Sequence, residues 1–395
     1  MRGWPFFLTR DFSPARQAGR RPGRARDKRL TRRAAVLFVA VLFPALIGCP
    51  STTSPESAPN STGTGGSGEG ERLQVVATTA MVGDVVRAVG GEHVDVTVLL
   101  GPGVDPHLHL VTRDDIARLM AADLVFYSGL MLEGKMTDSL RKLSTSKPVH
   151  AVTDAISEDQ LLPGTRSDSS AQPPTSPANR SESPAGGGGL GGPDSGGDAP
   201  HADPHAWFDV RLWGQTANLV AEVLGREKPA AAEEFQEAAE RFQADLAALD
   251  EYARQTLDSI PESNRVLITS HDAFGYFGRA YGVRVLGVQG ISTDSEAGLR
   301  RVNELVDRIV EEDLPAVFIE SSVSRKSIEA LIDGARSRGH EVTIGGELYS
   351  DAAGPGGTYE STYIGMVDHN VTTIARALGG EAPAGGMSGR LGTAP

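Results

Sequence analysis

The sequence predicts an α/β protein with two lobes and mostly parallel sheets. Two stretches of the chain alternate short β-branched runs with helical segments, as parallel βα units do. Between them, apolar residues recur every three or four positions from Pro229 to Ile260, which predicts one long helix. At 1.5 Å per residue this helix would be roughly 45 Å long, enough to join two lobes. An ordinary surface helix would give the same pattern.

The first lobe is expected over residues 72–228. A strand-like run, LQVVATTA, begins at Leu73 and is followed by helical spacing and the β-branched run VDVTVLL. A helix from Arg113 to Ala122 and the strand LVFYSG come next, and residues 209–225 have helical spacing. This order predicts parallel βα units.

Residues 164–202 interrupt the first lobe. They are rich in Ser, Pro and Gly and have almost no apolar side chains to bury. Such a segment cannot offset the entropy of ordering, so a disordered insertion is expected here rather than a domain boundary. It ends beside His205, where it would lie near any site built there.

The linking helix is assigned to residues 229–260 and the second lobe to 261–382. In that lobe VLITS, AVFIE and HEVTIGG are strand-like, and helical segments separate them. Residues 383–395 are expected to form a disordered tail.

Residues 1–49 have the pattern of a secretory signal. A basic segment precedes an apolar run from Ala34 to Ile47 that is shorter than the about 20 residues of a transmembrane helix. The run ends in Leu-Ile-Gly-Cys, which resembles the bacterial lipobox and makes Cys49 the expected lipidation site. An uncleaved anchor with an incidental cysteine is the alternative, and Arg32-Arg33 leaves the Sec and twin-arginine pathways both open.

Residues 50–71 are rich in Ser, Thr, Gly and Pro and are expected to be a flexible tether. A lipid-anchored protein of the periplasm or cell surface follows from this arrangement. Cys49 is the only cysteine, which excludes an internal disulfide and a cysteine-rich zinc site. The net charge of −13 argues against nucleic acid and suits either cation attraction or simple solubility.

Four residues stand out as candidate metal ligands: His107, His205, His271 and Asp351. Apolar or β-branched runs lie next to them, and α/β sheets bind ligands beyond the carboxyl ends of their strands. The tripeptide Asp-Pro-His occurs twice, ending at His107 and at His205. A lone histidine is usually structural, but three imidazoles and one carboxylate together suit Zn²⁺, with Mn²⁺ also plausible.

From Leu73 to about Leu378 the chain resembles the substrate-binding lipoproteins of zinc and manganese ABC importers. The resemblance rests on the blocks LLGPGVDPHLHL, AADLVFYSGLMLEG, DPHAWFDVRLW, ITSHDAFGYFGRAYGV, GVQGISTDSEAG and AVFIESSVS. It implies two α/β lobes joined by one rigid helix, with the metal in the cleft between them. It also places the family's ligands on His107, His205, His271 and Asp351.

The resemblance implies a function and partners as well. The chain would bind Zn²⁺ or Mn²⁺ as a transported ion and deliver it to an ABC permease and its ATPase, as a monomer anchored to the membrane by lipid. Glu320 and Asp272 are expected to orient the ligand side chains without contacting the metal themselves. His109 is expected not to be a ligand, and His201, nearly alone in the insertion, is a doubtful metal collector.

Two other classes of function stay open. A metallohydrolase would need an open coordination position and a general base, and the sequence has no His-Glu-x-x-His motif. A site closed by four protein ligands leaves no such position, so no enzyme activity is expected. A surface adhesin of the same fold is the second alternative.

Overall fold

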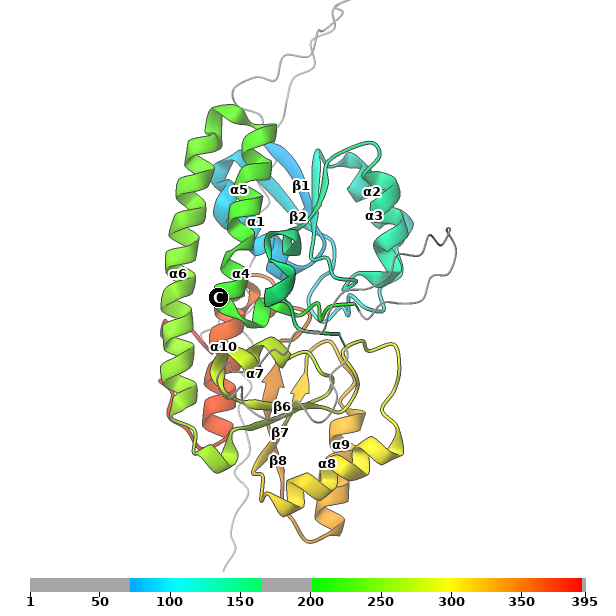
Figure 1. The fold of residues 1–395 in the computed structure, drawn as a ribbon, viewed down its shortest axis with the longest axis vertical. Coiled ribbons are helices and arrows are strands. Elements are labelled where there is room, and N and C mark those ends of the chain that lie inside the picture. Colours follow the sequence, from blue (N-terminus) through cyan, green and yellow to red (C-terminus); the bar gives the residue numbers. More distant parts are fainter. Residues whose placement is uncertain (1–71, 165–200, 393–395) are drawn as a thin grey trace, which may run out of the picture. The chain divides into compact units, whose positions relative to one another are not determined.

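The computed structural model describes residues 72–164 and 201–392 (Figure 1). The predicted signal sequence, Cys49, the tether and nearly all of the predicted insertion lie outside the described residues.

The first lobe is built on one four-stranded parallel sheet. Its strands are β1 (Leu73–Ala77), β2 (Val94–Val98), β3 (Leu124–Tyr127) and β4 (Val149–Ala151), in the order β2-β1-β3-β4. All three pairings are parallel. The carboxyl ends of the strands therefore meet at one edge, where the connecting loops carry polar side chains.

Five helices surround this sheet. They are α1 (Ala80–Gly90), α2 (Arg113–Ala121), α3 (Thr137–Leu143), α4 (Val210–Gly214) and α5 (Thr216–Glu227). α2 begins at a capping box, in which Thr112 and Asp115 satisfy each other's backbone N–H groups. One helix is expected over residues 209–225, and the structure has two helices there, α4 and α5.

The second lobe contains two parallel strand pairs. β5 (Val266–Thr269) pairs with β6 (Arg284–Gly287), and β7 (Ala316–Glu320) pairs with β8 (Thr343–Leu348). β5 lies against β7, which brings the two pairs together. The carboxyl ends of β5, β7 and β8 lead into the loops that matter below.

Three helices accompany these strands: α7 (Gly275–Tyr281), α8 (Leu299–Glu311) and α9 (Lys326–Ser337). A second buried cluster forms the core between β5 to β8 and the apolar faces of α8 and α9, with Leu305, Ile309 and Leu331 fully buried. The stripe of α8 is the one that the helical spacing predicts.

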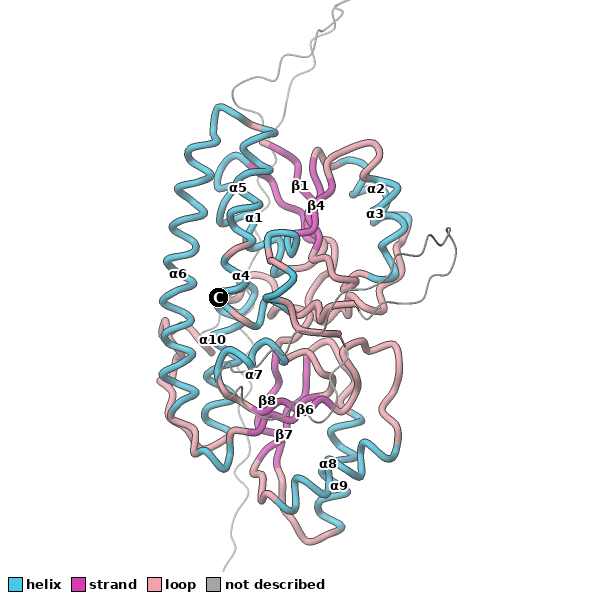
Figure 2. Tube along the Cα trace, viewed as in Figure 1, coloured by secondary structure: helices cyan, strands magenta, loops and turns pink. Residues whose placement is uncertain are grey.

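The long helix α6 (Ala232–Asp258) connects the lobes. It packs against α1, α4 and α5 of the first lobe and against α7 of the second (Figures 1 and 2). A second helix, α10 (Tyr363–Ala377), contacts α6, α1 and β8 and so also touches both lobes. The predicted fold class, two α/β lobes joined by one long helix, is confirmed.

The apolar face of α6 is the one that its spacing predicts. Phe235, Ala239 and Leu249 are buried in the largest apolar cluster, which includes residues of both lobes. The helix begins later than expected, because Pro229 opens a separate 3₁₀ turn up to Ala231, and it ends at Asp258 rather than Ile260. Among the described residues, no helix combines the length and apolarity needed to cross a membrane.

The expectation of a disordered tail does not hold for residues 383–392. The backbone N–H of Met387 donates to the buried carboxylate of Asp368 at 2.9 Å, and Arg390 lies over the ring of Tyr359 at 4.4 Å. These contacts to α10 and to the turn before it hold the glycine-rich segment in place, and composition alone does not reveal them.

Candidate metal site

The two Asp-Pro-His tripeptides form the same local turn. In each, an oxygen of the aspartate accepts the backbone N–H of the histidine two residues later, at 2.8 Å for Asp105 and His107 and 3.0 Å for Asp203 and His205. Such Asx turns are a usual role of aspartate, and the intervening proline fixes φ. Both Asp-Pro-His tripeptides therefore position their histidine by the same turn.

The other two candidates follow strands. His271 lies just after β5, and Asp351 lies shortly after β8, as the carboxyl-end rule predicts. His107 follows β2 at the same kind of edge. His205 differs, because no strand directly precedes it among the described residues. It lies at the start of a 3₁₀ turn, Ala206–Phe208.

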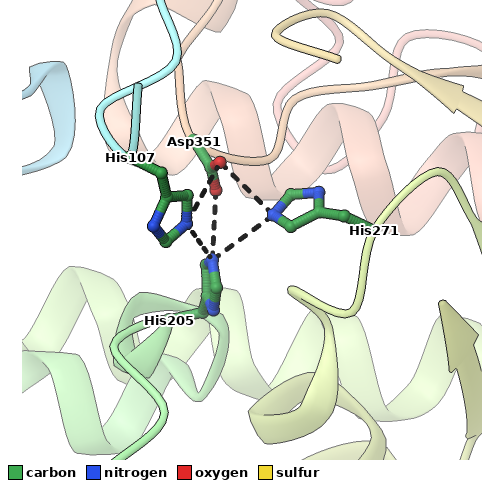
Figure 3. Close-up of side chains that lie close together, drawn as sticks. All are labelled: His107, His205, His271 and Asp351. Atoms are coloured by element: carbon green, nitrogen blue, oxygen red, sulfur yellow. Dashed lines mark hydrogen bonds and ion pairs between the residues drawn. The ribbon is translucent and has the colours of Figure 1, made fainter. Parts of the chain in front are cut away.

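The structure brings the four side chains together (Figure 3). Nε2 of His205 lies 3.3 Å from Nε2 of His107 and 3.4 Å from Nε2 of His271. The carboxylate oxygens of Asp351 lie 3.8, 3.4 and 3.3 Å from Nε2 of His107, His205 and His271. Two candidates come from each lobe, so the group joins the lobes.

The group is withdrawn from solvent, with His205 and His271 fully buried and His107 only 5% exposed. Burial lowers the pKa of His107 to about 4. Burial also disfavours charge on His205 and His271, but carboxylates outweigh it: Asp203 and Asp351 raise the pKa of His205, and Glu320 and Asp351 raise that of His271.

Asp351 is the acidic centre of the group. Burial disfavours its charged form, but His271 and His205 outweigh this effect and hold its pKa well below the usual range. Without an ion, the site therefore retains a negative carboxylate beside an imidazole that readily takes a proton. A cation that binds here has to displace that proton.

The residues fit a divalent transition metal. Both oxygens of Asp351 are buried and accept no well-aligned hydrogen bond among the described residues; their neighbours are the imidazole Nε2 atoms at 3.3 to 3.8 Å, and a bound cation would satisfy oxygens and imidazoles together. Zinc at about 2.0–2.1 Å from tetrahedral ligands requires ligand separations of about 3.3–3.4 Å. The separations of 3.3 and 3.4 Å between Nε2 of His205 and Nε2 of His107 and His271 meet this requirement, and all four ligand atoms lie within 4.8 Å of one another.

Carboxylates orient two of the imidazoles from behind. Nδ1 of His205 lies 2.7 Å from Asp203, and Nδ1 of His271 lies 2.6 Å from Glu320. Each carboxylate accepts the proton on Nδ1 and so leaves the Nε2 lone pair facing the centre. Glu320 was expected in this position, whereas Asp203 was missed although it belongs to the repeated tripeptide.

Three other expectations concern nearby polar residues. Asp272, expected beside Glu320 as a supporting group, donates its backbone N–H to Gly290. His109 pairs with Asp115 at 2.9 Å, at the start of α2, and is not in the group of four. His201 is exposed at the edge of the described residues.

One contact at the site has no signal in the sequence. Oγ1 of Thr293, in the second lobe, donates to Oδ2 of Asp105 at 2.6 Å, while Oδ1 of the same carboxylate accepts from His107. Nearby, Lys135 and Asp294 form an ion pair at 3.1 Å between the lobes. The loop that carries Thr293 thereby connects the second lobe to the turn that presents His107.

Known proteins resemble the chain along most of its length. A family model described as the periplasmic component A of a zinc-uptake complex matches residues 75–377. The manganese-binding lipoprotein MntA of Bacillus subtilis (strain 168) is 43% identical over 344 residues, covering 87% of this chain and 98% of that protein. The zinc-binding protein TroA of Treponema pallidum is 42% identical over 304 residues, covering 77% and 88%.

Solved structures agree with this likeness. The periplasmic zinc-binding protein TroA from Treponema pallidum matches with a TM-score of 0.67 and 42% identity, covering 78% of this chain and 99% of that one. An Fe(III)-bound YtgA from Chlamydia trachomatis matches with a TM-score of 0.63 and 26% identity, covering 78% and 99%.

Proposed function

The chain belongs to the family of periplasmic zinc-uptake components, and from this premise we propose that it captures Zn²⁺ or Mn²⁺ outside the cytoplasm and delivers the ion to an ABC permease. The ion is the transported substrate. His107, His205, His271 and Asp351 would hold it, and each lobe supplies two of these ligands.

The observation that carries the proposal is the convergence of three imidazole Nε2 atoms on the buried carboxylate of Asp351, with all four ligand atoms within 4.8 Å of one another. A cation supplies what both groups lack: a partner for the buried oxygens and an acceptor for the imidazole lone pairs. Four protein ligands around one ion leave no position for an activated water, which favours a receptor over a metallohydrolase.

The donor set supports both metals for different reasons. Three imidazoles favour zinc, because Mn²⁺ stands at the weak end of the divalent affinity series. Both oxygens of Asp351 face the group, so a second carboxylate contact to the ion would be available, which suits a metal that prefers oxygen ligands. One similar protein is named for manganese and another for zinc.

We further propose the arrangement in the cell. A lipid on Cys49 would anchor the protein outside the cytoplasmic membrane, and residues 50–71 would tether the folded part. That part would comprise lobes at 72–228 and 261–382 and a linking segment at 229–260 that contains α6, acting as a monomer on a permease that its ATPase drives. The similar MntA is itself named a lipoprotein.

Thermal unfolding with added metal tests the proposal. At one hundred times Kd, an ion that binds only the folded state adds about 2.7 kcal/mol of stability. We expect Zn²⁺ and Mn²⁺ to raise Tm at one ion per chain and Mg²⁺ to have little effect. Asp351→Ala should lose most of the increase. A wild-type Tm that neither Zn²⁺ nor Mn²⁺ changes would refute the receptor function.

A further inference from the structure

We propose that Trp207 is a positioning residue that sets the separation of His205 from Asp351 and that its indole reports whether a metal is bound. This inference deepens the proposed function and rests on it. Trp207 contacts His205 but is not one of the four candidate ligands.

The first observation is a pair of hydrogen bonds across the lobes. The indole Nε1–H of Trp207 donates to the backbone carbonyl of Ser350 at 3.1 Å. The backbone carbonyl of Trp207 accepts from the hydroxyl of Tyr363, the first residue of α10, at 2.6 Å. Trp207 therefore binds the second lobe at two points.

The position of these bonds in the chain gives them their effect. Trp207 is two residues from His205, and Ser350 precedes Asp351 directly. One short path, through the indole and a single hydrogen bond, thus joins a candidate ligand of the first lobe to one of the second. Trp207 is fully buried, so water does not replace this bond.

The same segment is fixed on its other side. The hydroxyl of Tyr276, in α7, donates to the backbone carbonyl of Asp203 at 2.8 Å and accepts from the backbone N–H of Leu162 at 3.0 Å. Residues 203–207 are consequently held from both directions by elements of the second lobe. Metal sites need ligands placed within about 0.5 Å, so loss of one of these contacts should weaken binding.

The second observation concerns the rings. The indole of Trp207 meets the imidazole of His205 nearly edge-on, with ring centroids 5.2 Å apart and planes at 68°. A divalent cation on the far nitrogen of this imidazole changes the charge beside the indole. The emission of Trp207 should therefore change when metal binds, without any added dye.

The chain contains a matched control in Trp213. It is also fully buried, and its ring lies 6.3 Å from that of Trp207. Its indole Nε1–H has no hydrogen-bond partner among the described residues. Replacing either tryptophan by phenylalanine removes the same volume from the core, but only Trp207→Phe removes a bond across the lobes.

The experiment compares full-length wild-type protein with W207F and W213F by competition of Zn²⁺ with a chelator and by tryptophan emission. We expect W207F to bind Zn²⁺ about tenfold more weakly than W213F, the effect of about one buried hydrogen bond. The change in emission on adding Zn²⁺ should persist in W213F and be lost in W207F. Trp4 is common to both variants and cancels from the comparison.

Both variants should lose thermal stability without metal through a similar cavity, and W207F should lose more because it also loses the buried bond to Ser350. Tyr363→Phe keeps the ring and deletes only the hydroxyl bonded to Trp207, so it tests the same positioning if W207F does not fold. We expect a several-fold loss of Zn²⁺ affinity. The control is Tyr252→Phe, which removes a hydroxyl bond to Thr372 elsewhere on α10.

Equal Zn²⁺ affinities for W207F and W213F, or equal affinities for Y363F and Y252F where W207F does not fold, would overturn the inference while leaving the receptor function intact. An emission change that persists in W207F would also overturn the reporter role. A wild-type protein that binds neither Zn²⁺ nor Mn²⁺ would refute the receptor function and this inference with it.

Discussion

Glu320→Gln should weaken metal binding through His271 without touching the metal. In the wild-type protein Oε1 of Glu320 accepts the backbone N–H of His271 at 2.9 Å, and Oε2 lies 2.6 Å from its Nδ1. An amide has only one oxygen. If that oxygen keeps the backbone bond, the NH₂ group faces Nδ1 and favours the tautomer with its proton on Nε2, which cannot bind a metal.

The size of the effect follows from this geometry. Loss of a group that orients a metal-binding histidine typically costs about 10–100-fold in affinity, or about 1.4–2.7 kcal/mol. Both bonds from Glu320 are buried and go to the same residue, so we expect a loss in the upper half of this range. Isothermal titration with Zn²⁺ against a competing chelator at pH 8 measures it.

The dependence on pH gives a second, independent readout. The pKa of His271 is raised against the opposing effect of burial, mainly by Glu320 and next by Asp351. Because a proton competes with the metal, the affinity of the wild type for Zn²⁺ should fall as the pH decreases. The fall should begin at a pH above the ordinary histidine pKa of about 6.5. Glu320→Gln lowers this pKa, so the Zn²⁺ affinity of the variant begins to fall at a lower pH. The difference in affinity between wild type and variant should therefore narrow from pH 8 to pH 6.

Glu133→Gln is the control for a buried carboxylate. Glu133 is 2% exposed and accepts from the hydroxyl of Thr78 and the backbone N–H of Ser128, and neither of these belongs to the group of four. We expect the control to lose stability but to bind Zn²⁺ as tightly as the wild type. Equal losses of affinity in both variants, or a loss below about twofold for Glu320→Gln, would refute the orienting role.

Two further predictions follow from the site. His205→Ala should weaken Zn²⁺ binding more than about 100-fold, the upper value for loss of an orienting group. His109→Ala should change the affinity less than about threefold, because the His109 ring pairs with Asp115. Equal losses of affinity in a chelator competition would refute the assignment of His205, and not His109, as a ligand. Thr293→Val removes the 2.6 Å hydrogen bond to Asp105 and should increase the rate of metal release, measured by stopped-flow, by about 5–10-fold. Ser292→Ala in the same loop should leave this rate unchanged. Identical release rates for the two variants would refute a role for the contact between Thr293 and Asp105.

The sequence predicts the fold largely because hydrophobic periodicity is a local signal. The buried face of α6 and the stripe of α8 can be identified from spacing alone. The strand β4 has only three residues, which is too short a pattern to be recognised between neighbouring segments. The tail was misjudged because bonds to Asp368 and Tyr359 order it, and these depend on tertiary structure.

The candidate site shows the same division. Strand ends make His107, His271 and Asp351 candidates, and the repeated tripeptide makes His205 one. The resemblance to the metal receptors selects these four, and the selection of Asp351 depends on it most. Whether all four bind metal stays a prediction. The groups that fix them from behind are less accessible, because each contact joins residues far apart in the chain.

Two of those contacts illustrate the reason. Trp207 and Ser350 lie in different lobes, and so do Thr293 and Asp105, and neither pair has a spacing that any secondary structure would impose. Asp203 is the exception, since the Asx turn that it forms at His205 is the one that Asp105 forms at His107.

The wide separation of the four candidate ligands along the chain has a consequence for biosynthesis. Contacts between distant residues form late in folding, and Asp351 is the last of the four to leave the ribosome. A nascent or unfolded chain therefore offers isolated imidazoles rather than a preformed cage. If the Sec pathway exports the chain unfolded, the chain would cross the cytoplasm without trapping an ion and would form its metal site only after folding on the other side of the membrane.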